Sequence, residues 1–321
     1  MRVALLTLAT PLPDRPSIGR YNIAQCKAIN ALGHTAEIFT CAPKVPQWTA
    51  RLSKTCDRHA SRSGTHVIDG IKVTTTQINF VYSKLIRERF APYFPQTVSK
   101  SFSSQSISLL RPKLKRFNPD LIVVHGIMPW AETAVQLSGS LHARLVAIEH
   151  SQSDIDRIET CKRIRHHYKK MGARFDQVFT VNQRMMKTLS MAGVKRARQI
   201  YNGIERVEKA HTVRSNSDTF DILCVGAYIE RKGHRVLLEA VSRIKKNNIR
   251  LKLVGLPTVP LLKHIKKLGL SDIVEVLPEM NQSDLREQMR CADLFALPSW
   301  DEAFGLVYAE SLSVNTPVLL T

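Results

Sequence analysis

The sequence predicts an α/β protein built from two consecutive doubly wound, Rossmann-like domains. Apolar runs rich in Val, Ile and Leu alternate with amphipathic stretches, which is the pattern of a parallel sheet covered by helices on both faces. A polar, irregular stretch at Glu208–Thr219 interrupts the alternation, which then restarts. With 321 residues, the chain also favours two domains over one.

The polar stretch predicts a first domain at 1–207, a linker at 208–219 and a second domain at 220–321. The first domain begins with the apolar run Arg2–Leu8, which precedes a proline-rich loop and a helix that closes at Gly33. Its predicted strands are Arg2–Leu8, Thr35–Cys41, Leu121–His125, Arg144–Ile148 and Gln177–Val181, and its helices include Tyr21–Leu32 and Gln183–Ala192.

The second domain shows the alternation more cleanly. Its predicted strands are Asp221–Val225, Arg250–Val254, Ile273–Leu277, Leu294–Leu297 and Pro317–Leu320, and its predicted helices are His234–Asn247, Leu261–Leu268, Ser283–Cys291 and Leu306–Val314. In a doubly wound domain the ligand crevice lies at the carboxyl ends of the strands. The loops that follow the strands are therefore where we expect the site residues.

The charge of the chain limits the class of its partners. It has 47 Lys and Arg against 27 Asp and Glu, a formal net charge of +20. So basic a protein attracts polyanions, which leaves nucleic acid, an anionic membrane surface and a phosphate-rich small substrate as candidates. The sequence has neither an RRM-type aromatic motif nor zinc-finger spacing, so a specific nucleic acid is not an expected partner.

Apolar runs and cysteine usage predict a cytoplasmic protein. No run is long enough for a transmembrane helix, and the first one lacks the cleavage pattern of a signal peptide. The six cysteines are scattered without a CxxC pair, which favours reduced thiols over a disulfide framework or a zinc site.

The most informative segment is PSWDEAFGLVYAE, at Pro298–Glu310. A predicted strand runs into a Pro-Ser turn, an acidic loop with Glu302, and then Gly305 and a helix that carries Glu310. The amino end of a helix leaves backbone N–H groups free to bind an anion or a sugar hydroxyl. Because Glu310 lies more than a turn inside the helix, one hydroxyl-rich ligand can contact both carboxylates. The alternative is a solvated acidic loop before a surface helix.

This spacing resembles the signature of the retaining family-four glycosyltransferases. The resemblance rests on Glu302 and Glu310 with seven residues between them, on Phe304-Gly305, and on the leading Pro298-Ser299. It implies a GT-B fold, in which two Rossmann-like domains face each other across a cleft. It also implies that Glu302 contacts the transferred sugar, that Glu310 binds the nucleotide ribose, and that the backbone around the glycine contacts sugar hydroxyls or phosphate.

A second segment, Asp221–Val241, is similar to the Gly-Arg…Lys-Gly loop of that family, whose Arg and Lys hold the diphosphate leaving group. Lys232 matches, but Ala227 stands at the Arg position, and the neighbouring Arg231 is the candidate to compensate. In a metal-independent enzyme these cations neutralise the charge that grows on the diphosphate. We therefore expect no metal and no other cofactor, and a lower rate or donor affinity from the missing Arg. Taken alone, the two cations also fit a solvated pair at the start of a helix.

Weaker matches lie in the first half of the chain. His125, in NPDLIVVHGIMPW, resembles the family histidine that faces the donor sugar, and Gly19 lies where the family has a Gly-rich turn near the phosphates. A structural histidine and an ordinary loop glycine are the alternatives, and we interpret His150 as a loop or core histidine. The expected catalytic residues are Glu302, Lys232 and His125, and the expected donor-binding residues are Gly19, Gly226, Arg231, Phe304, Gly305, Leu306 and Glu310.

Two further features concern metal and membrane. Asp154-Ile155-Asp156 has the DxD spelling of metal-dependent transferases, but no strand leads into it, so we interpret it as surface charge. Cys161–Arg174 contains six Lys or Arg and no acid, with more basic clusters at Lys84–Arg89 and Arg111–Arg116. Such stretches dock on anionic lipid or form a solvated helix face, and both readings stay open.

The sequence therefore predicts transfer of a sugar from a nucleotide-diphosphate donor to a polysaccharide or lipid-linked glycan acceptor, with retention implied by the resemblance. Family members continue past the predicted Pro317–Leu320 strand, so the second domain is expected to be incomplete. Together with Ala227, this leaves a non-catalytic GT-B scaffold or an inactive fragment as the competing hypothesis.

Overall fold

The computed structural model describes residues 1–12, 17–45, 63–81, 83, 85–205, 218–244, 248–255 and 258–321. They belong to two compact units. Unit 1 comprises Met1–Thr10 and Gly19–Gly203, and unit 2 comprises Pro11–Ile18 and Ile204–Thr321. Of the linker predicted at 208–219, only Asp218 and Thr219 lie within the described residues.

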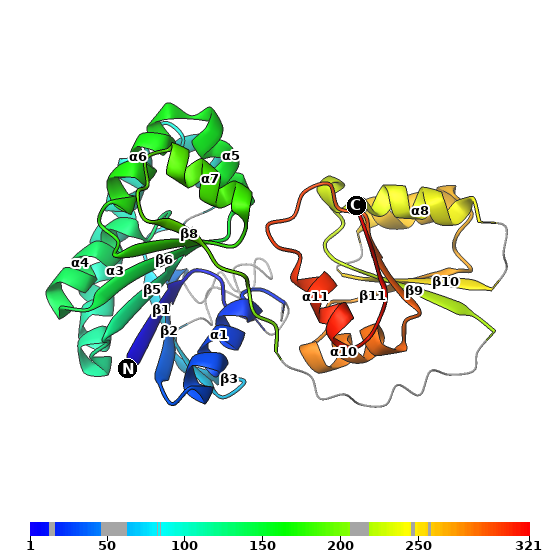
Figure 1. The fold of residues 1–321 in the computed structure, drawn as a ribbon, viewed down its shortest axis with the longest axis horizontal. Coiled ribbons are helices and arrows are strands. Elements are labelled where there is room, and N and C mark those ends of the chain that lie inside the picture. Colours follow the sequence, from blue (N-terminus) through cyan, green and yellow to red (C-terminus); the bar gives the residue numbers. More distant parts are fainter. Residues whose placement is uncertain are drawn as a thin grey trace. The chain divides into compact units, whose positions relative to one another are not determined.

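Unit 1 is built on an eight-stranded sheet in the order β3-β4-β2-β1-β5-β6-β7-β8 (Figure 1). Neighbouring strands are parallel except for the antiparallel β3–β4 pair. Because β2 lies on one side of β1 and β5 on the other, the sheet reverses its winding between β1 and β5. The strands are β1 (Arg2–Thr7), β2 (Thr35–Pro43), β3 (Gly64–Ile68), β4 (Ile71–Ile78), β5 (Leu121–His125), β6 (Arg144–Glu149), β7 (Gln177–Thr180) and β8 (Ala197–Gln199).

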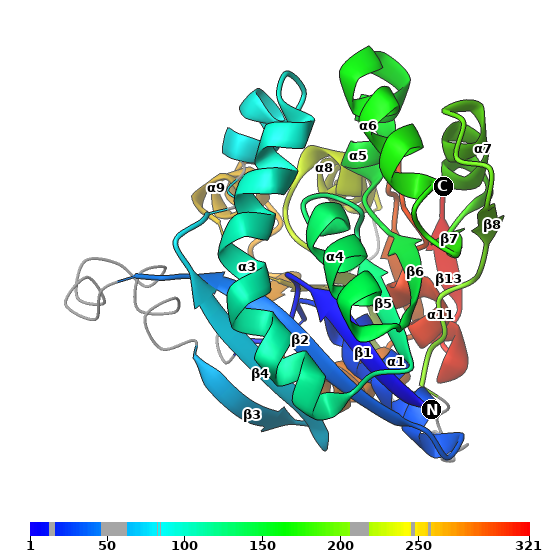
Figure 2. The same ribbon diagram turned by 90° about the vertical axis from the view of Figure 1, so that its left-hand side faces the viewer.

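Helices cover both faces of this sheet. α3 and α4 lie on one face, in front of the strands in Figure 2, and α1 lies on the other (Figure 1). The apolar faces meet in a dry core, where Phe102 of α3 packs edge-on against the fully buried Trp130 with ring centroids 4.8 Å apart. The helical segments are α1 (Arg20–Ala31), η2 (Ile86–Phe90), α3 (Pro95–Phe117), α4 (Ala131–Leu141), α5 (Gln152–Thr160), α6 (Lys162–Gly172) and α7 (Gln183–Met191).

Unit 2 has a five-stranded parallel sheet in the order β11-β10-β9-β12-β13. Here the winding reverses between β9 and β12. In Figure 1, α8 lies on one face of the sheet and α10 and α11 lie on the other. The elements are β9 (Phe220–Val225), η3 (Glu230–Lys232), α8 (His234–Ser242), β10 (Ile249–Val254), α9 (Val259–Lys267), β11 (Val274–Leu277), α10 (Gln282–Cys291), β12 (Leu294–Leu297), α11 (Leu306–Ser313) and β13 (Val318–Leu320).

The predicted strands are all present, with ends that differ by two residues at most. Two helix boundaries were wrong. The helix predicted from His234 ends at Ser242 within the described residues. The helix predicted to start at Leu261 starts at Val259, because Thr258 caps it and Pro260 is tolerated in a first turn, where its missing N–H has no intrahelical partner to lose.

The two loops beside the reversal in unit 2 pack main chain against main chain. Gly233 has a φ of +65°, and a Cβ atom on it would lie 1.8 Å from the carbonyl oxygen of Pro298. The backbone N–H of Trp300 donates to the carbonyl oxygen of Arg231 at 2.9 Å. Only glycine allows this approach, so Gly233 fixes the loop after β9 against the loop after β12.

We predict that Gly233→Ala destabilises unit 2 more than Gly269→Ala does. Gly269 has a similar φ of +68° but no atom within 4 Å of its missing Cβ, so its substitution introduces only backbone strain. The clash with Pro298 should lower the free energy of unfolding by a further ~1–3 kcal/mol. Urea unfolding of both variants measures the difference, and equal losses would mean that the loops do not pack as described.

Candidate functional site

The reversal point of each sheet gathers the residues that the sequence singled out. In unit 2 the loops that follow the neighbouring strands β9 and β12 carry Lys232 and Glu302. In unit 1 the loop after β1 contains Gly19, and His125 is the last residue of the neighbouring β5. A parallel sheet offers its ligand crevice at such points, because the adjacent loops there run to opposite faces.

Lys232 and Glu302 form an ion pair across the two loops of unit 2. The ammonium group contacts Oε1 of Glu302, and the hydroxyl of Ser299 donates to the same oxygen at 2.8 Å. Only 15% of the Lys232 side chain and 19% of the Glu302 side chain are exposed. Partial burial weakens the screening by water, so this pair holds its geometry better than a surface pair does.

Arg231 reaches the same carboxylate from the outside. Its Nη1 atom lies 3.9 Å from Oε2 of Glu302 and donates to the carbonyl oxygen of Asp301 at 3.0 Å. About half of its side chain, 48%, is exposed. The structure thus brings both cations of the predicted basic loop to the predicted sugar-binding glutamate, from adjacent positions in the sequence.

The start of the basic loop is formed by small residues. Gly226 follows β9, and a Cβ atom there would lie 3.9 Å from both the Lys232 side chain and the His234 ring. His234 is buried, and its burial, followed by the charge of Lys232, lowers its pKa. It therefore stays neutral beside the lysine. Ala227 is exposed and supplies no charge at the position where the family resemblance implies an arginine.

Gly305 begins α11 with a φ of +75°, and a Cβ atom on it would lie 2.4 Å from the ring of Tyr308. The Tyr308 hydroxyl donates to the carbonyl oxygen of Leu297 at 2.9 Å and so fixes the first turn of α11 against β12. Glu310, further along α11, accepts a hydrogen bond from Gln282 of α10 at 2.9 Å.

The other two residues predicted in this segment flank the glycine. Phe304 and Leu306 are both half-buried, so each side chain at the start of α11 is partly accessible to solvent. The predicted order along the chain is kept: one glutamate in the loop, the glycine at the helix start, and the second glutamate within the helix.

Gly19 is required by the close packing of the loop after β1. Its φ is +67°, and a Cβ atom would lie 2.2 Å from the carbonyl oxygen of Ala9. The Asn22 side chain of α1 donates to that same oxygen at 2.7 Å and to the hydroxyl of Thr7 at 3.2 Å. The glycine therefore has a structural reason to be present that needs no ligand.

His125 lies in a neutral, largely buried histidine pair. Its Nδ1 is 2.9 Å from Nε2 of His150, the two rings are stacked with an interplanar angle of 10°, and Tyr21 packs against both. Burial lowers the pKa of His150 to about 4 and, together with His150, lowers the pKa of His125 well below its usual range. The Nε2 atom of His125 is buried and has no hydrogen-bond partner among the described residues.

The interpretation of His150 as a loop or core histidine agrees with its place in the loop after β6 and with its partial burial, but its contact with His125 was not predicted. The available signal was that His125 ends one predicted strand and His150 follows the next. The interpretation of the DxD sequence as surface charge was wrong for one of its two aspartates. Asp154 is 8% exposed and accepts a hydrogen bond from Arg157 at 2.6 Å, whereas Asp156 is half exposed and pairs with Arg184, as surface charge would.

The described part of the chain contains no group of three or more His, Cys, Asp or Glu side chains that could hold a metal ion. Within the same residues, no helix is both long and apolar enough to cross a bilayer.

Several solved structures share the fold of this chain. The sucrose-phosphate synthase of Thermosynechococcus elongatus aligns with a TM-score of 0.72 and 18% identity, over 99% of this chain and 80% of that one. HepE from Anabaena, solved in complex with UDP and glucose, aligns with a TM-score of 0.67 and 17% identity, again over 99% and 80%. At this identity the likeness concerns the fold, which is GT-B.

Curated relatives match a shorter stretch. A D-inositol 3-phosphate glycosyltransferase of Streptosporangium roseum is 34% identical over 121 residues, which are 34% of this chain and 28% of the relative. The corresponding protein of Paenarthrobacter aurescens is 32% identical over 112 residues, or 32% and 28% of the two chains. The match thus spans little more than a quarter of the length of these relatives.

Two family models divide the chain between them. Residues 206–321 match the model described as glycosyl transferases group 1, and residues 18–207, more than half of the chain, match the model described as glycosyltransferase family 4. Their boundary falls beside the polar stretch predicted to be the linker. The chain therefore belongs to glycosyltransferase family 4, with a group 1 glycosyltransferase segment forming its second half.

Proposed function

We propose that this chain transfers a hexose from a nucleotide-diphosphate sugar to a polysaccharide or lipid-linked glycan acceptor, with retention of configuration. The observation that carries the proposal is the Lys232–Glu302 pair at the reversal point of unit 2. The donor class is supported by the similar structures, since HepE was solved with UDP and glucose and a starch synthase with ADP.

In this proposal Lys232 and Arg231 bind the diphosphate. A lysine ammonium has three N–H donors, so Lys232 can keep its contact with Glu302 while it donates to a phosphate oxygen. Both cations come from a loop held by Gly233, so they are in place before charge develops on the leaving group. Transfer then needs no metal, and EDTA should leave it unchanged.

The carboxylates recognise hydroxyl groups. Glu302, fixed by Lys232 and Ser299, is assigned to the hydroxyls of the donor sugar, and Glu310 to the ribose. Backbone groups at Phe304, Gly305 and Leu306 and beside Gly226 line the donor in the same scheme. His125 is assigned to a sugar hydroxyl on the family resemblance; burial, followed by the charge of His150, lowers its pKa, and its Nε2 has no partner within the described residues.

Ala227 favours a second candidate, a GT-B scaffold that binds donor without transferring sugar. One cation is absent from the position where the family resemblance expects it, and the half-exposed Arg231 has to replace it. Retained donor binding without release of nucleotide would identify this scaffold, whereas the loss of both would identify an inactive fragment.

We also propose a cytoplasmic location with peripheral attachment to an anionic membrane surface. The structure brings the start of α6 beside the segment before α3: Arg163 donates to the carbonyl oxygen of Tyr93 at 3.3 Å. The two segments share a cavity of about 380 Å³. Tyr93 and Phe94 are 61% and 57% exposed beside it. This basic–aromatic surface is formed by Tyr93, Phe94, Lys162, Arg163 and His166.

Exposed aromatic rings beside clustered cations fit the interface of an anionic bilayer, because the rings enter the headgroup region while the cations attract lipid phosphates. If the partner were a soluble protein with a polar surface, the exposed aromatic rings would have no apolar region to enter. The acceptor in this proposal is a lipid-linked glycan or a growing polysaccharide. Attachment of the protein to the membrane would keep it near a lipid-linked acceptor.

The donor assignment predicts a graded response in a thermal-shift panel with UDP, GDP, ADP and their glucose conjugates in EDTA. One nucleotide should raise the melting temperature of the wild type. Lys232→Met should weaken its binding at least about tenfold, since a hydrogen bond to a charged group contributes about 1.5–3 kcal/mol. Glu302→Gln should keep binding the nucleotide but lose the extra shift given by the attached glucose.

Lys267→Met is the matched control, because it removes the same charge at the carboxyl end of α9. That end leads into β11 and so lies at the amino ends of the strands, away from the loops that follow β9 and β12. If it weakens binding as much as Lys232→Met does, net charge and not the loop binds the nucleotide. The absence of any shift with folded wild-type protein would rule out the proposed donor site in this chain.

The membrane assignment predicts that Lys162→Glu/Arg163→Glu weakens binding to phosphatidylglycerol-containing vesicles. Loss of two cations at about 1 kcal/mol each corresponds to about thirtyfold, the two added carboxylates should increase the loss further, and added salt should weaken binding of the wild type. Co-sedimentation measures the effect. The control is Lys266→Glu/Lys267→Glu, which makes the same charge change at two exposed lysines near the end of α9 in unit 2, outside the basic clusters singled out in the sequence. Equal losses from both variants would show non-specific attraction and contradict the assigned surface.

A further inference from the structure

Glu149, the last residue of β6, is a carboxylate with no exposed surface. Its Oε1 accepts hydrogen bonds from the backbone N–H groups of His150 and Ser151, both at 3.0 Å. Its Oε2 accepts from the backbone N–H of Ile127 at 3.1 Å and from the hydroxyl of Tyr168 at 3.3 Å. Four donors thus converge on one side chain, and three of them are main-chain groups.

These main-chain donors belong to the two loops that carry the histidine pair. Ile127 follows His125 by two residues after β5, and His150 and Ser151 directly follow β6. The backbone N–H of Gly126 also donates to the carbonyl oxygen of Ile148 at 2.9 Å, so the two strands stay paired up to the loops. Beyond this last backbone hydrogen bond the two loops are linked by Glu149, whose side-chain oxygens accept from backbone N–H groups that no longer face a backbone carbonyl.

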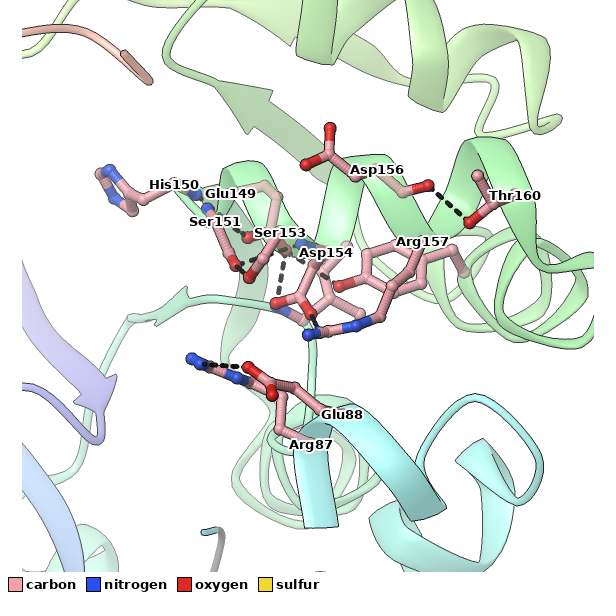
Figure 3. A network of polar contacts seen from close by, with 12 residues as sticks. Arg87, Glu88, Glu149, His150, Ser151, Ser153, Asp154, Asp156, Arg157 and Thr160 are labelled. Atoms are coloured by element: carbon pink, nitrogen blue, oxygen red, sulfur yellow. Dashed lines mark hydrogen bonds and ion pairs between the residues drawn. The ribbon is translucent and has the colours of Figure 1, made fainter. Parts of the chain in front are cut away.

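A carboxylate suits this position better than any other side chain. It offers two acceptor oxygens and no donor, whereas glutamine would place an NH₂ group against two of the four donors. Burial and the nearby Asp154 raise the pKa of Glu149, and the three backbone donors oppose that rise because they favour the ionised form. The network is drawn in Figure 3, where the His150 ring points away from Asp154 and Arg157.

The charged and titratable groups around Glu149 come from several elements. Asp154 and Arg157 belong to α5 and form an ion pair at 2.6 Å, and Tyr168 belongs to α6. Burial raises the pKa of Asp154, and the charges of Arg157 and of Arg87, which belongs to η2, oppose that rise. Figure 3 shows Arg87 on the side of this cluster opposite α5. Asp154 therefore has its own cations, and Glu149 is left with the loop backbone as its main partner.

We propose that Glu149 is a positioning residue: its buried carboxylate holds the loops after β5 and β6 together and thereby sets the pairing of His125 with His150. The proposal rests on the proposed function for the role of His125 in donor recognition. Replacing the carboxylate by the amide of glutamine sets an NH₂ group against two of the four donors, at least one of them a buried backbone N–H, so the loops separate to reach water and the histidine rings lose their 2.9 Å contact.

The test is nitrogen-15 NMR of the full chain with labelled histidine at pH 8, with His125→Gln and His150→Gln as assignment variants. The wild type should show one hydrogen-bonded imidazole N–H shared by the two rings and protected from exchange. Glu149→Gln should lose it, and the pKa of His150 should rise from about 4 toward its ordinary value as water enters. Tyr168→Phe, which keeps the three backbone bonds, should retain the signal.

A folded Glu149→Gln variant that keeps the shared N–H and the depressed histidine pKa values would overturn the proposal, because Glu149 would then only stabilise the fold. Should that variant not fold, amide exchange of the wild type decides: the N–H groups of Ile127, His150 and Ser151 should exchange slowly and together, and rapid exchange would equally overturn it.

Turnover separates this proposal from the proposed function. In a chain that releases nucleotide from its donor, Glu149→Gln should lower kcat on the order of a hundredfold, the cost of misplacing a contact group, with KM for the donor little changed. A wild type that binds no donor would defeat the proposed function, while the histidine spectra would still decide the role of Glu149.

Discussion

The close approach of two backbone loops in unit 2 determines how the charged side chains of the candidate donor site are arranged. β9 and β12 are neighbours in the sheet although they lie far apart in sequence, so their loops start side by side. Gly233 then lets the loop after β9 touch Pro298, and this contact places Lys232 beside Glu302, 70 residues further along the chain. The ion pair is a consequence of the backbone contact, because long side chains alone would not hold one geometry against their own entropy.

The reversal points of the two sheets differ in charge. That of unit 2 collects two cations and a carboxylate with partial exposure, which suits a ligand that carries phosphate charge. The reversal point of unit 1 holds a buried, neutral histidine pair. The carboxylate of Glu149 accepts hydrogen bonds from backbone N–H groups of the loops after β5 and β6. Similar topology thus places charged side chains at one reversal point and a buried histidine pair at the other, and the difference arises from which residues follow the strands.

Much of this could be predicted from the sequence because parallel strands carry strong local signals. The runs at Leu121–His125 and Leu294–Leu297 are bounded by polar residues and were placed without error. Lys232, Glu302 and Gly305 were identified by a family resemblance that has a physical basis, a glycine and two carboxylates at the start of a helix. The pairing of Lys232 with Glu302 could not be predicted, since it depends on a strand order that no local pattern encodes.

Buried polar residues were the hardest to interpret. His150 and Asp154 look like ordinary loop and surface residues in the sequence, and Glu149 attracts no notice there. His150 and Glu149 have partners from another element, namely His125 at the end of β5 and the Ile127 N–H in the loop after β5, whereas Asp154 pairs with Arg157 within α5. The sequence places His125 and His150 at the ends of two successive predicted strands, but their contact depends on the pairing and register of β5 and β6, which no local pattern encodes.

Binding of the donor by the two loops beside the reversal in unit 2 can be measured by hydrogen–deuterium exchange of the wild-type chain with and without UDP-glucose, the ligand of the HepE complex. We expect slower exchange in the loops at 226–233 and 298–305 and in the first turn of α11, with β10 and β11 unchanged. Slowing confined to other segments, with these loops unaffected, would contradict it.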